Sequence, residues 1–403
     1  MFKGKRRVVS VIIAVVVVGF MLTARLSSVK AVGTIEDKLE IYLRALQIVQ
    51  TEYIEKDVDE TKLIYGSIKG MLESLDDPYS RFMEPSAFKE MNIRMSGSYS
   101  GIGIYIGLKD KQIVVISPIK DTPADQMGLK AGDKILKIGQ KPTNDMALDE
   151  AVSLIRGQAG TYVVLNIMRG AWKEPKDFKI MREKITIKSV ESKSINEDIY
   201  YIKLNTFENE NSAQEMENAI NRAKSVKAKG LILDLRNNGG GLLRMAIDIG
   251  SMFVDNGAIV YTVDRDGGKK TYSTTRPRLW AKPTVMIVNE ASASASEILA
   301  GALQDNGVAT IVGTHTFGKA CVQDVKPLDD GSAILLTVMK YYTPNGSDIT
   351  KKGIIPDVVV ELPASVTMEA EGELEISEKD DIQLKKAIDI LEEKIPTPVG
   401  NRR

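Results

Sequence analysis

The residues whose chemistry could support catalysis lie in one stretch, from Asn289 to Gln323. Its first part, NEASASASE, follows an apolar run that predicts a strand over 284–288 and precedes a helical pattern of apolar residues. A serine in a tight turn between a strand and a helix presents its hydroxyl beside free backbone N–H groups. Ser292, Ser294 and Ser296 are therefore the candidate nucleophiles.

A serine nucleophile needs a base, and the chain has one histidine, His315, and one cysteine, Cys321. Lysine is a recognised substitute for histidine, and Lys319 follows a second predicted strand over 309–313. Free lysine has a pKa of about 10.4. To lower this pKa to about 7–8, burial must disfavour the charged amine by roughly 4 kcal/mol. We expect Phe317 and Val322 to bury it. Gln323, four residues on, shares the face of Lys319 in a helix or a strand and could orient the amine.

Alternative explanations exist for each of these residues. Ser294 and Glu297 form the pattern S-x-x-E, a capping box that would begin a helix without any chemistry. Lys319 in a loop could be solvated, as most lysines are. His315 leaves open a Ser-His-Asp enzyme, although no acid is matched to it.

The segments N-E-A-S-A-S-A-S-E-I-L-A-G-A-L-Q-D and T-F-G-K-A-C-V-Q resemble the active-site region of the C-terminal processing peptidases, or tail-specific proteases. The resemblance implies that Ser294 is the nucleophile, Lys319 its base and Gln323 the support of that base. The resemblance also implies that Glu297, Asp305 and Thr316 support the site. If a helix begins at Ser294, Asp305 lies about three turns further on, on the same face. The family usually has glycine at the position of Ala291, and it commonly has glycine at the position of Ala320.

A second motif follows the buried strand predicted over 230–235 and reads R-N-N-G-G-G-L-L. A glycine-rich turn between a strand and a helix can bind an anion through its N–H groups. A phosphate site is the alternative use, but the lysine and hydroxyl of a P-loop are missing. The family resemblance makes this turn the oxyanion-hole loop, with Gly240 and Gly241 as its glycines and the N–H of Ala295 as the second donor.

Residues 92–183 resemble a PDZ domain. A strand is predicted over 99–106 after a glycine turn, A-G-D-K-I-L follows in register, and a helix is predicted over 147–156. The resemblance implies that a loop grips the terminal carboxylate of a peptide, which adds as a strand. Its residues are Ser100, Gly101, Ile102, Gly103 and Ile104. Arg156 resembles a family arginine tied to switching; the alternative is an ordinary surface salt bridge.

Length and composition limit the other possibilities. The 403 residues suffice for two or three domains, and 54 basic against 54 acidic residues give no case for nucleic-acid binding. One cysteine and one histidine provide neither a disulfide framework nor a metal cluster, and no cofactor is implied. Four basic residues before the uncharged run 8–24 predict a signal or single-pass anchor over 1–33. Because the cleavage site is weak, a retained anchor is favoured over secretion after cleavage.

The rest of the chain completes an α/β multidomain fold. We expect an N-terminal helical region over 34–91, a peptidase core of alternating strands and helices over 184–362, and an acidic linker with a C-terminal helix over 363–403. The resemblance implies that the core is crotonase-like. The apolar side of the last helix, predicted over 383–394, could serve docking or dimerisation, which leaves a homodimer open.

The sequence thus predicts a membrane-anchored serine endopeptidase whose peptidase domain lies outside the cytoplasm. It would cleave proteins near apolar C-termini, gated by a PDZ domain that binds the substrate tail. A non-catalytic PDZ adaptor at the membrane is the alternative, and it would require the nucleophile or the base to be lost.

Overall fold

The computed structural model describes residues 33–109, 111–170, 172–362 and 380–395. The chain divides into two compact units, residues 1–74 and 75–403, which we describe separately. The predicted membrane segment lies outside the described residues except for Gly33, and so does the acidic linker up to residue 379. Within the described ranges no helix combines the length and apolarity that a membrane span requires.

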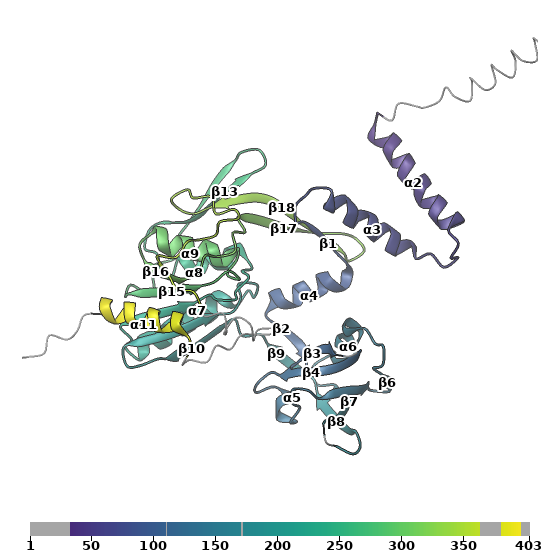
Figure 1. Cartoon of the computed structure of the whole chain (residues 1–403), viewed down its shortest axis with the longest axis horizontal. Helices are drawn as coiled ribbons and strands as arrows, with labels where there is room; N and C mark the ends of the chain where they lie inside the picture. Colours follow the sequence, from purple (N-terminus) through teal and green to yellow (C-terminus); the bar gives the residue numbers. More distant parts are fainter. Residues whose placement is uncertain (1–32, 110, 171, 363–379, 396–403) are drawn as a thin grey trace, which may run out of the picture. The chain divides into compact units, whose positions relative to one another are not determined.

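The described part of the first unit contains two helices, as its sequence pattern predicts: α2 (Ile35–Glu52) and α3 (Glu60–Glu73) (Figure 1). Each begins at a residue whose side chain accepts a backbone N–H of the first turn. Thr34 accepts from Asp37, and Asp59 accepts from Lys62. None of the residues of α2 is buried.

The second unit begins with a segment that the helical prediction for 34–91 describes incorrectly. Residues Arg81–Met83 form a strand, β1, which pairs antiparallel with β18 (Ala333–Tyr342) of the peptidase core. Phe82 and Met83 are buried there. The following helix α4 (Pro85–Ser96) begins at Pro85, because proline disfavours helix at the residue before it but fits the first helical position.

The region predicted to be a PDZ domain forms a sheet in which the strands run in the order β3-β4-β5-β7-β8, with β6 beside β5. Its core contains Ile113, Ile135, Leu165, Ile167 and Ile180, each fully buried. Its elements are β3 (Ile104–Lys109), β4 (Gln112–Pro118), α5 (Pro123–Gln126), β5 (Lys134–Ile138), β6 (Lys141–Pro142), α6 (Leu148–Ile155), β7 (Tyr162–Met168) and β8 (Lys176–Met181).

The strand predicted over 99–106 is in fact two strands. Residues Ser98–Gly101 form β2, which pairs antiparallel with β9 (Glu183–Thr186), and β3 begins only at Ile104. Gly103 between them has φ +78, and a Cβ there would come within 2.4 Å of Thr122. The chain therefore turns between two sheets at a position that needs glycine.

The region predicted to be the peptidase core is built on a six-stranded sheet with the order β10-β11-β12-β15-β16-β19. All neighbouring pairs are parallel except β10 and β11. The strands are β10 (Val190–Ser194), β11 (Ile199–Leu204), β12 (Gly230–Asp234), β15 (Thr284–Val288), β16 (Ala309–Gly313) and β19 (Val358–Val359). Three helices contribute to one face: α7 (Ser212–Ser225), α8 (Leu243–Gly250) and α9 (Ala295–Asp305).

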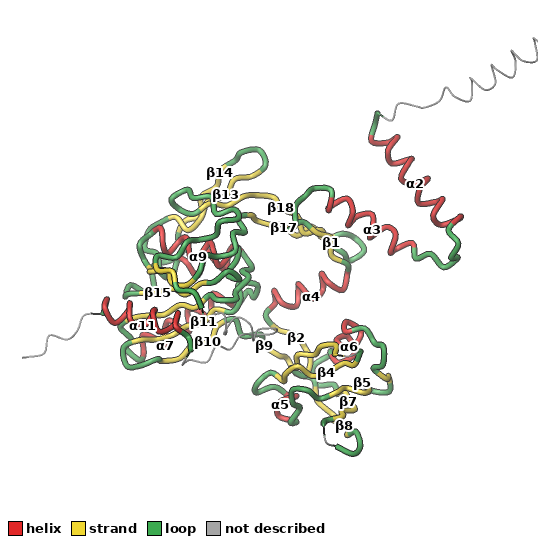
Figure 2. The backbone as a smooth tube through the Cα atoms, viewed as in Figure 1, coloured by secondary structure: helices red, strands yellow, loops and turns green. Residues whose placement is uncertain are grey.

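The strand residues alternate between two apolar layers, as the pleat of a strand requires. Leu231, Leu233 and Met286 pack with residues of α7, α8 and α9. Ile232 and Val285 face the opposite layer, which contains helix α11 (Ile382–Lys394) (Figure 2). The apolar side of α11 is therefore used within the chain: its Leu384, Ala387, Ile390 and Leu391 are buried against the sheet. Docking on the core, and not dimerisation, is the role that the structure gives to this side.

A second sheet of the core has the order β1-β18-β13-β14, with β17 paired to β18. The new strands are β13 (Ala258–Asp264), β14 (Lys269–Ser273) and β17 (Cys321–Pro327). Through β17 this sheet carries Gln323, while β1 brings the segment before the PDZ region next to β18.

Candidate active site

The serine turn places its three hydroxyl groups in different surroundings. Ser292 and Ser296 are fully buried, and their hydroxyls donate to the carbonyl oxygens of Leu235 and Asn238, both at 2.8 Å. Ser294 is only half-buried. Its backbone has φ +56 and ψ −114, a strained conformation for any residue other than glycine. The middle serine is thus the one that the turn holds at the surface.

Glu297 joins the serine turn to the lysine loop. The capping box expected from Ser294 and Glu297 is present. The carboxylate of Glu297 is fully buried and accepts hydrogen bonds at both oxygens. Oε2 accepts the N–H groups of Ser294 (2.8 Å) and Lys319 (2.9 Å). Oε1 accepts the hydroxyl of Thr316 (2.5 Å) and the N–H of Gly318 (2.6 Å). One side chain therefore sets the spacing between the two loops.

Lys319 meets Gln323 as the four-residue spacing predicts. Lys319 Nζ donates to Gln323 Oε1 at 2.6 Å. Gln323 Nε2 in turn donates to the main-chain oxygen of Tyr79, in the segment just before β1. The ring of Tyr79 also lies against the amine, with Nζ 4.8 Å from its centroid. The lysine is thus held by two residues that are far from each other in sequence.

Burial lowers the pKa of Lys319, and the positive charge of Arg81 adds to this effect. Negative charge at Cys321, and to a smaller extent at Asp77 and Glu297, acts in the opposite direction but does not reverse it. The prediction that Phe317 supplies this burial is wrong, because its side chain is 53% exposed. Val322 does pack against the core, and the ring of Tyr79 takes the place expected for Phe317.

The glycine turn lies directly against the serine turn. A Cβ at Gly240 would come within 2.8 Å of Ala295 N and 2.9 Å of Ser294 Cβ, so only glycine fits there. The N–H of Gly240, however, donates to Asn238 Oδ1 at 2.9 Å. Gly241 has φ +145 and is exposed. Within the described residues, the N–H groups of Gly241 and Ala295 have no hydrogen-bond partner.

Residues that the sequence analysis did not identify complete the arrangement. The hydroxyl of Tyr341, on β18, lies 3.1 Å from the carbonyl oxygen of Ser294 and also donates to that of Lys319. Burial raises the pKa of Tyr341 well above its ordinary value, so this hydroxyl remains a donor. Asn238 accepts the N–H of Ala293 at its carbonyl oxygen and so joins the glycine and serine turns.

Two residues with expected roles lie away from this cluster. Asp305 ends α9, and its carboxylate accepts the N–H of Asn345 at 2.8 Å, so it orders the loop after β18. At 1.5 Å per residue, the other end of the helix is about 16 Å distant. His315 is exposed, and its Nδ1 lies 3.1 Å from the carbonyl oxygen of Thr316. It contacts no carboxylate in the described part of the chain, which leaves a histidine triad without its acid.

The segment 100–104, predicted to bind a terminal carboxylate, is linked to Arg156, which follows α6. The guanidinium forms an ion pair with Glu90 of α4 and lies 4.8 Å from the centroid of the Tyr99 ring. A Cβ at Gly101 would come within 2.9 Å of the same ring. The hydroxyl of Ser100 is buried without a partner among the described residues. Ile102 is buried, while Ile104 packs partly buried against the PDZ core.

Comparison with known proteins identifies the family. Residues 198–360 match peptidase family S41, residues 90–168 match the PDZ domain, and residues 23–87 match the N-terminal domain of activating protease CtpB. The chain is 40% identical to carboxy-terminal processing protease CtpA of Bacillus subtilis, over 83% of this chain and 71% of that protein.

A second curated relative agrees with this result. A carboxyl-terminal-processing protease of Synechocystis is 36% identical, over 85% of this chain and 80% of the relative. The solved structure of a photosystem II D1 C-terminal processing protease is 33% identical, with a TM-score of 0.48, over 82% of this chain and 95% of that one. With its PDZ domain and its α/β core, the chain belongs to the carboxy-terminal processing proteases, serine peptidases of family S41.

Proposed function

We propose that the chain is an endopeptidase in which Ser294 is the nucleophile and Lys319 the general base. In the first step Ser294 Oγ attacks the scissile carbonyl carbon while Lys319 Nζ takes the hydroxyl proton. Lys319 then gives this proton to the leaving amine, and water hydrolyses the acyl-enzyme in the same way. Gln323 orients the amine without adding charge. The observation that carries the proposal is the buried carboxylate of Glu297, which bonds the N–H groups of both Ser294 and Lys319.

The N–H groups of Ala295 and Gly241 are the donors that best fit the developing oxyanion. Both lack a partner within the described residues, whereas that of Gly240 is taken by Asn238. Each such donor is worth roughly 3–4 kcal/mol in the transition state. The role of Gly240 is then steric, because its missing side chain lets the two turns approach.

The test is digestion of β-casein, an unfolded protein, by the full-length chain. Ser294→Ala should abolish cleavage, whereas Ser292→Ala and Ser296→Ala, which remove buried structural hydroxyls, should leave a measurable rate in the folded fraction. Activity that survives Ser294→Ala would contradict the assignment. A non-catalytic adaptor would show no Ser294-dependent cleavage at all.

The PDZ domain, in the same proposal, selects substrates by their C-termini. Its carboxylate loop, Ser100 to Ile104, would receive an apolar tail as an added strand. The ion pair of Arg156 with Glu90 gives this loop a connection to α4, which leads from the PDZ domain towards β1. Tail binding that shifts Arg156 would therefore reach the segment that holds Gln323.

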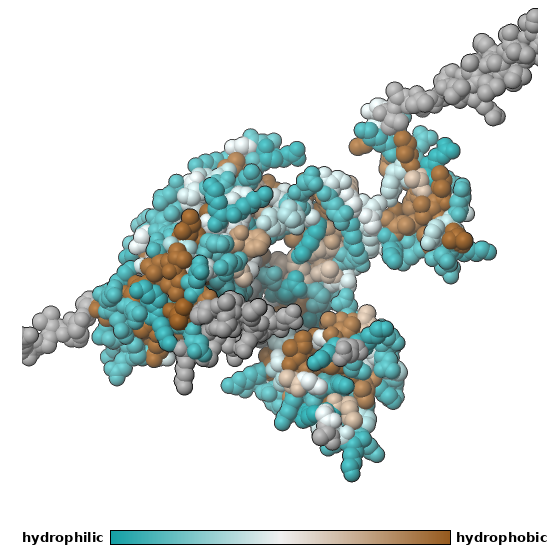
Figure 3. All heavy atoms as spheres, viewed as in Figure 1, coloured by the Kyte–Doolittle hydropathy of each residue, from teal (hydrophilic) through white to brown (hydrophobic). Residues whose placement is uncertain are grey.

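Export, membrane anchoring and dimerisation belong to the proposal as well. The basic residues and apolar run at the N-terminus support a signal anchor that places the peptidase outside the cytoplasm. For dimerisation the support is the apolar surface of α2, which Figure 3 shows in brown. Its exposed members are Ile35, Leu39, Ile41, Leu43, Ile48 and Val49. Light scattering of wild type against Leu39→Glu tests this: a dimer that persists in the variant would exclude this surface.

A further inference from the structure

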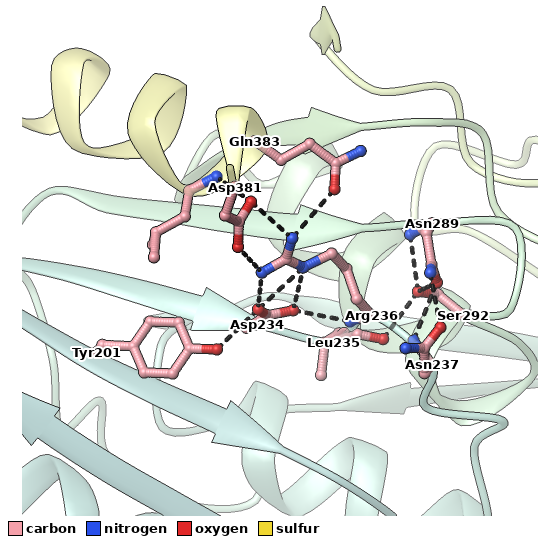
Figure 4. Close-up of polar contacts among 10 residues, drawn as sticks. Tyr201, Asp234, Leu235, Arg236, Asn237, Asn289, Ser292, Asp381 and Gln383 are labelled. Carbon is pink, nitrogen blue, oxygen red and sulfur yellow. Dashed lines mark hydrogen bonds and ion pairs between the residues drawn. The ribbon is translucent and has the colours of Figure 1, made fainter. Parts of the chain in front are cut away.

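Helix α11 is connected to the catalytic turns through one buried arginine. Arg236 follows β12 and begins the glycine turn, yet its guanidinium reaches the start of α11 (Figure 4). Its side chain is 11% exposed, and its two acidic partners, Asp234 and Asp381, are 2% and 6% exposed. Such a cluster is held by its own hydrogen bonds, because each group would be costly to bury alone.

The guanidinium is shared between the sheet and the helix. On the sheet side, Nε and Nη2 donate to the carboxylate of Asp234 at 2.6–3.1 Å. On the helix side, Nη1 and Nη2 donate to the two oxygens of Asp381 at 2.9 and 2.8 Å, and Nη1 also donates to Gln383 Oε1 at 3.2 Å. A bidentate pair of this kind fixes orientation as well as distance.

The same arginine fixes the backbone at the start of the glycine turn. Its N–H donates to Asp234 Oδ1 at 2.9 Å, so the carboxylate that holds the guanidinium also holds the main chain. The next residue, Asn237, has φ +62 and exchanges two hydrogen bonds with Asn289, at 3.0 and 2.8 Å. Asn289 begins the serine turn, and its N–H donates to Ser292 Oγ at 3.0 Å. Figure 4 shows these contacts as one continuous set.

We infer that the N-terminus of α11 is a positioning element of the active site: Asp381 and Gln383 hold Arg236, and Arg236 holds the glycine turn against the serine turn. The inference rests on the proposed function for its catalytic consequence. The helix that follows the linker must be docked for the oxyanion donors of Gly241 and Ala295 to keep their positions. Asp381, Gln383 and Arg236 are positioning residues that touch no substrate.

Asp381→Asn separates this role from the stability of the helix. Asp381 Oδ1 accepts both Leu384 N and Arg236 Nη1, while Oδ2, among the described residues, accepts only Arg236 Nη2. Asparagine is about as good as aspartate at starting a helix, so Leu384 keeps its acceptor. The amide NH₂ then faces Arg236 Nη2, donor against donor, and the guanidinium must move. Asp389→Asn, at an exposed position of the same helix, makes the same change of charge as a control.

The experiment measures kcat and KM of the full-length chain on a short quenched peptide with a free apolar C-terminus. Asp381→Asn should lower kcat about 10- to 100-fold, the range expected when catalytic groups are misplaced by up to about 1 Å. KM should stay within about twofold, because the donors act in the transition state. Asp389→Asn should match the wild type. A wild-type kcat in Asp381→Asn would overturn the inference.

Two further measurements keep the inference testable in every case. If Asp381→Asn does not fold, Gln383→Leu is used instead, because it removes one acceptor of Arg236. It should lower kcat about threefold, which corresponds to about half of the 1.36 kcal/mol that a tenfold change requires. An unchanged kcat in Gln383→Leu would refute the inference. Amide hydrogen exchange should also be faster at 236–241 in Asp381→Asn than in Asp389→Asn. The exchange measurement does not require an active enzyme. A chain with no Ser294-dependent cleavage would therefore refute the proposed function, and hydrogen exchange alone would then test the coupling between α11 and the glycine turn.

Discussion

Replacing Glu297 by glutamine changes one atom of a buried group that accepts four hydrogen bonds. If the amide oxygen keeps the place of Oε1, its NH₂ faces the N–H groups of Ser294 and Lys319, and both lose their acceptor. If the amide flips, the N–H of Gly318 loses its acceptor instead. An unsatisfied buried N–H costs about 1–3 kcal/mol, so the expected destabilisation is roughly 1–3 kcal/mol for the flipped amide and 2–6 kcal/mol otherwise.

The loss should appear in stability and in rate together. With the flipped amide, a loss of about 2 kcal/mol lowers the Tm by roughly 4–8 °C in a domain of this size. The rate should fall by up to about 100-fold, because the loops of nucleophile and base are no longer joined. Calorimetry and peptide kinetics measure the two effects, and Glu290→Gln, at an exposed position in the same turn, is the matched control. Wild-type values of Tm and kcat in Glu297→Gln would refute the reasoning; complete inactivity at an unchanged Tm would instead indicate a direct chemical role.

Five other outcomes are expected. Because burial lowers the pKa of Lys319, kcat/KM should rise with pH through a midpoint below about 10.4; a flat profile would contradict a lysine base. The free energy of unfolding should also rise with pH between the pKa of Lys319 in the folded chain and its higher pKa in the unfolded chain, because over this range the unfolded chain still binds the proton. Lys319→Met should remove that rise. His315→Ala should keep kcat within about threefold, and a sharp drop without unfolding would favour the histidine enzyme. Tyr341→Phe leaves the carbonyl oxygen of Lys319 without its donor, while that of Ser294 keeps the N–H groups of Glu297 and Ile298. Tm and kcat should both fall, whereas an unchanged kcat would limit the hydroxyl to a structural role. Amidation of a substrate's C-terminus should slow cleavage strongly, and equal rates for amidated and free tails would exclude gating by the PDZ domain.

Local patterns were sufficient for much of the fold. The strands 284–288 and 309–313 have the limits that were predicted, because short apolar runs between turn residues specify buried parallel strands. The meeting of Lys319 and Gln323 followed from their spacing alone. The capping box at Ser294 was also visible, since it depends on residues within one turn.

Contacts between distant segments were not predictable in the same way. Tyr79 holds Gln323 through a main-chain oxygen, an atom that every residue has, so no side-chain pattern marks it. Residues 81–83 become a strand only because β18, about 250 residues later, supplies their partner. Phe317 has the apolar character of a core residue, and only the course of the loop places it in solvent. In the glycine turn, Asn238 decides which N–H is occupied, and this depends on tertiary structure.

The pairing of β2 with β9 joins the two ends of the PDZ domain. The strand by which the chain enters the domain lies alongside the strand by which it leaves, joined over four residue pairs from Ser98–Thr186 to Gly101–Glu183. The PDZ domain is thus an insertion between β1 and the remaining strands of the catalytic sheets, connected through the paired strands β2 and β9. The two strands cannot slide past one another without breaking the backbone hydrogen bonds that join them. PDZ domains of related proteins should therefore be exchangeable here, with both junctions placed on the paired strands β2 and β9.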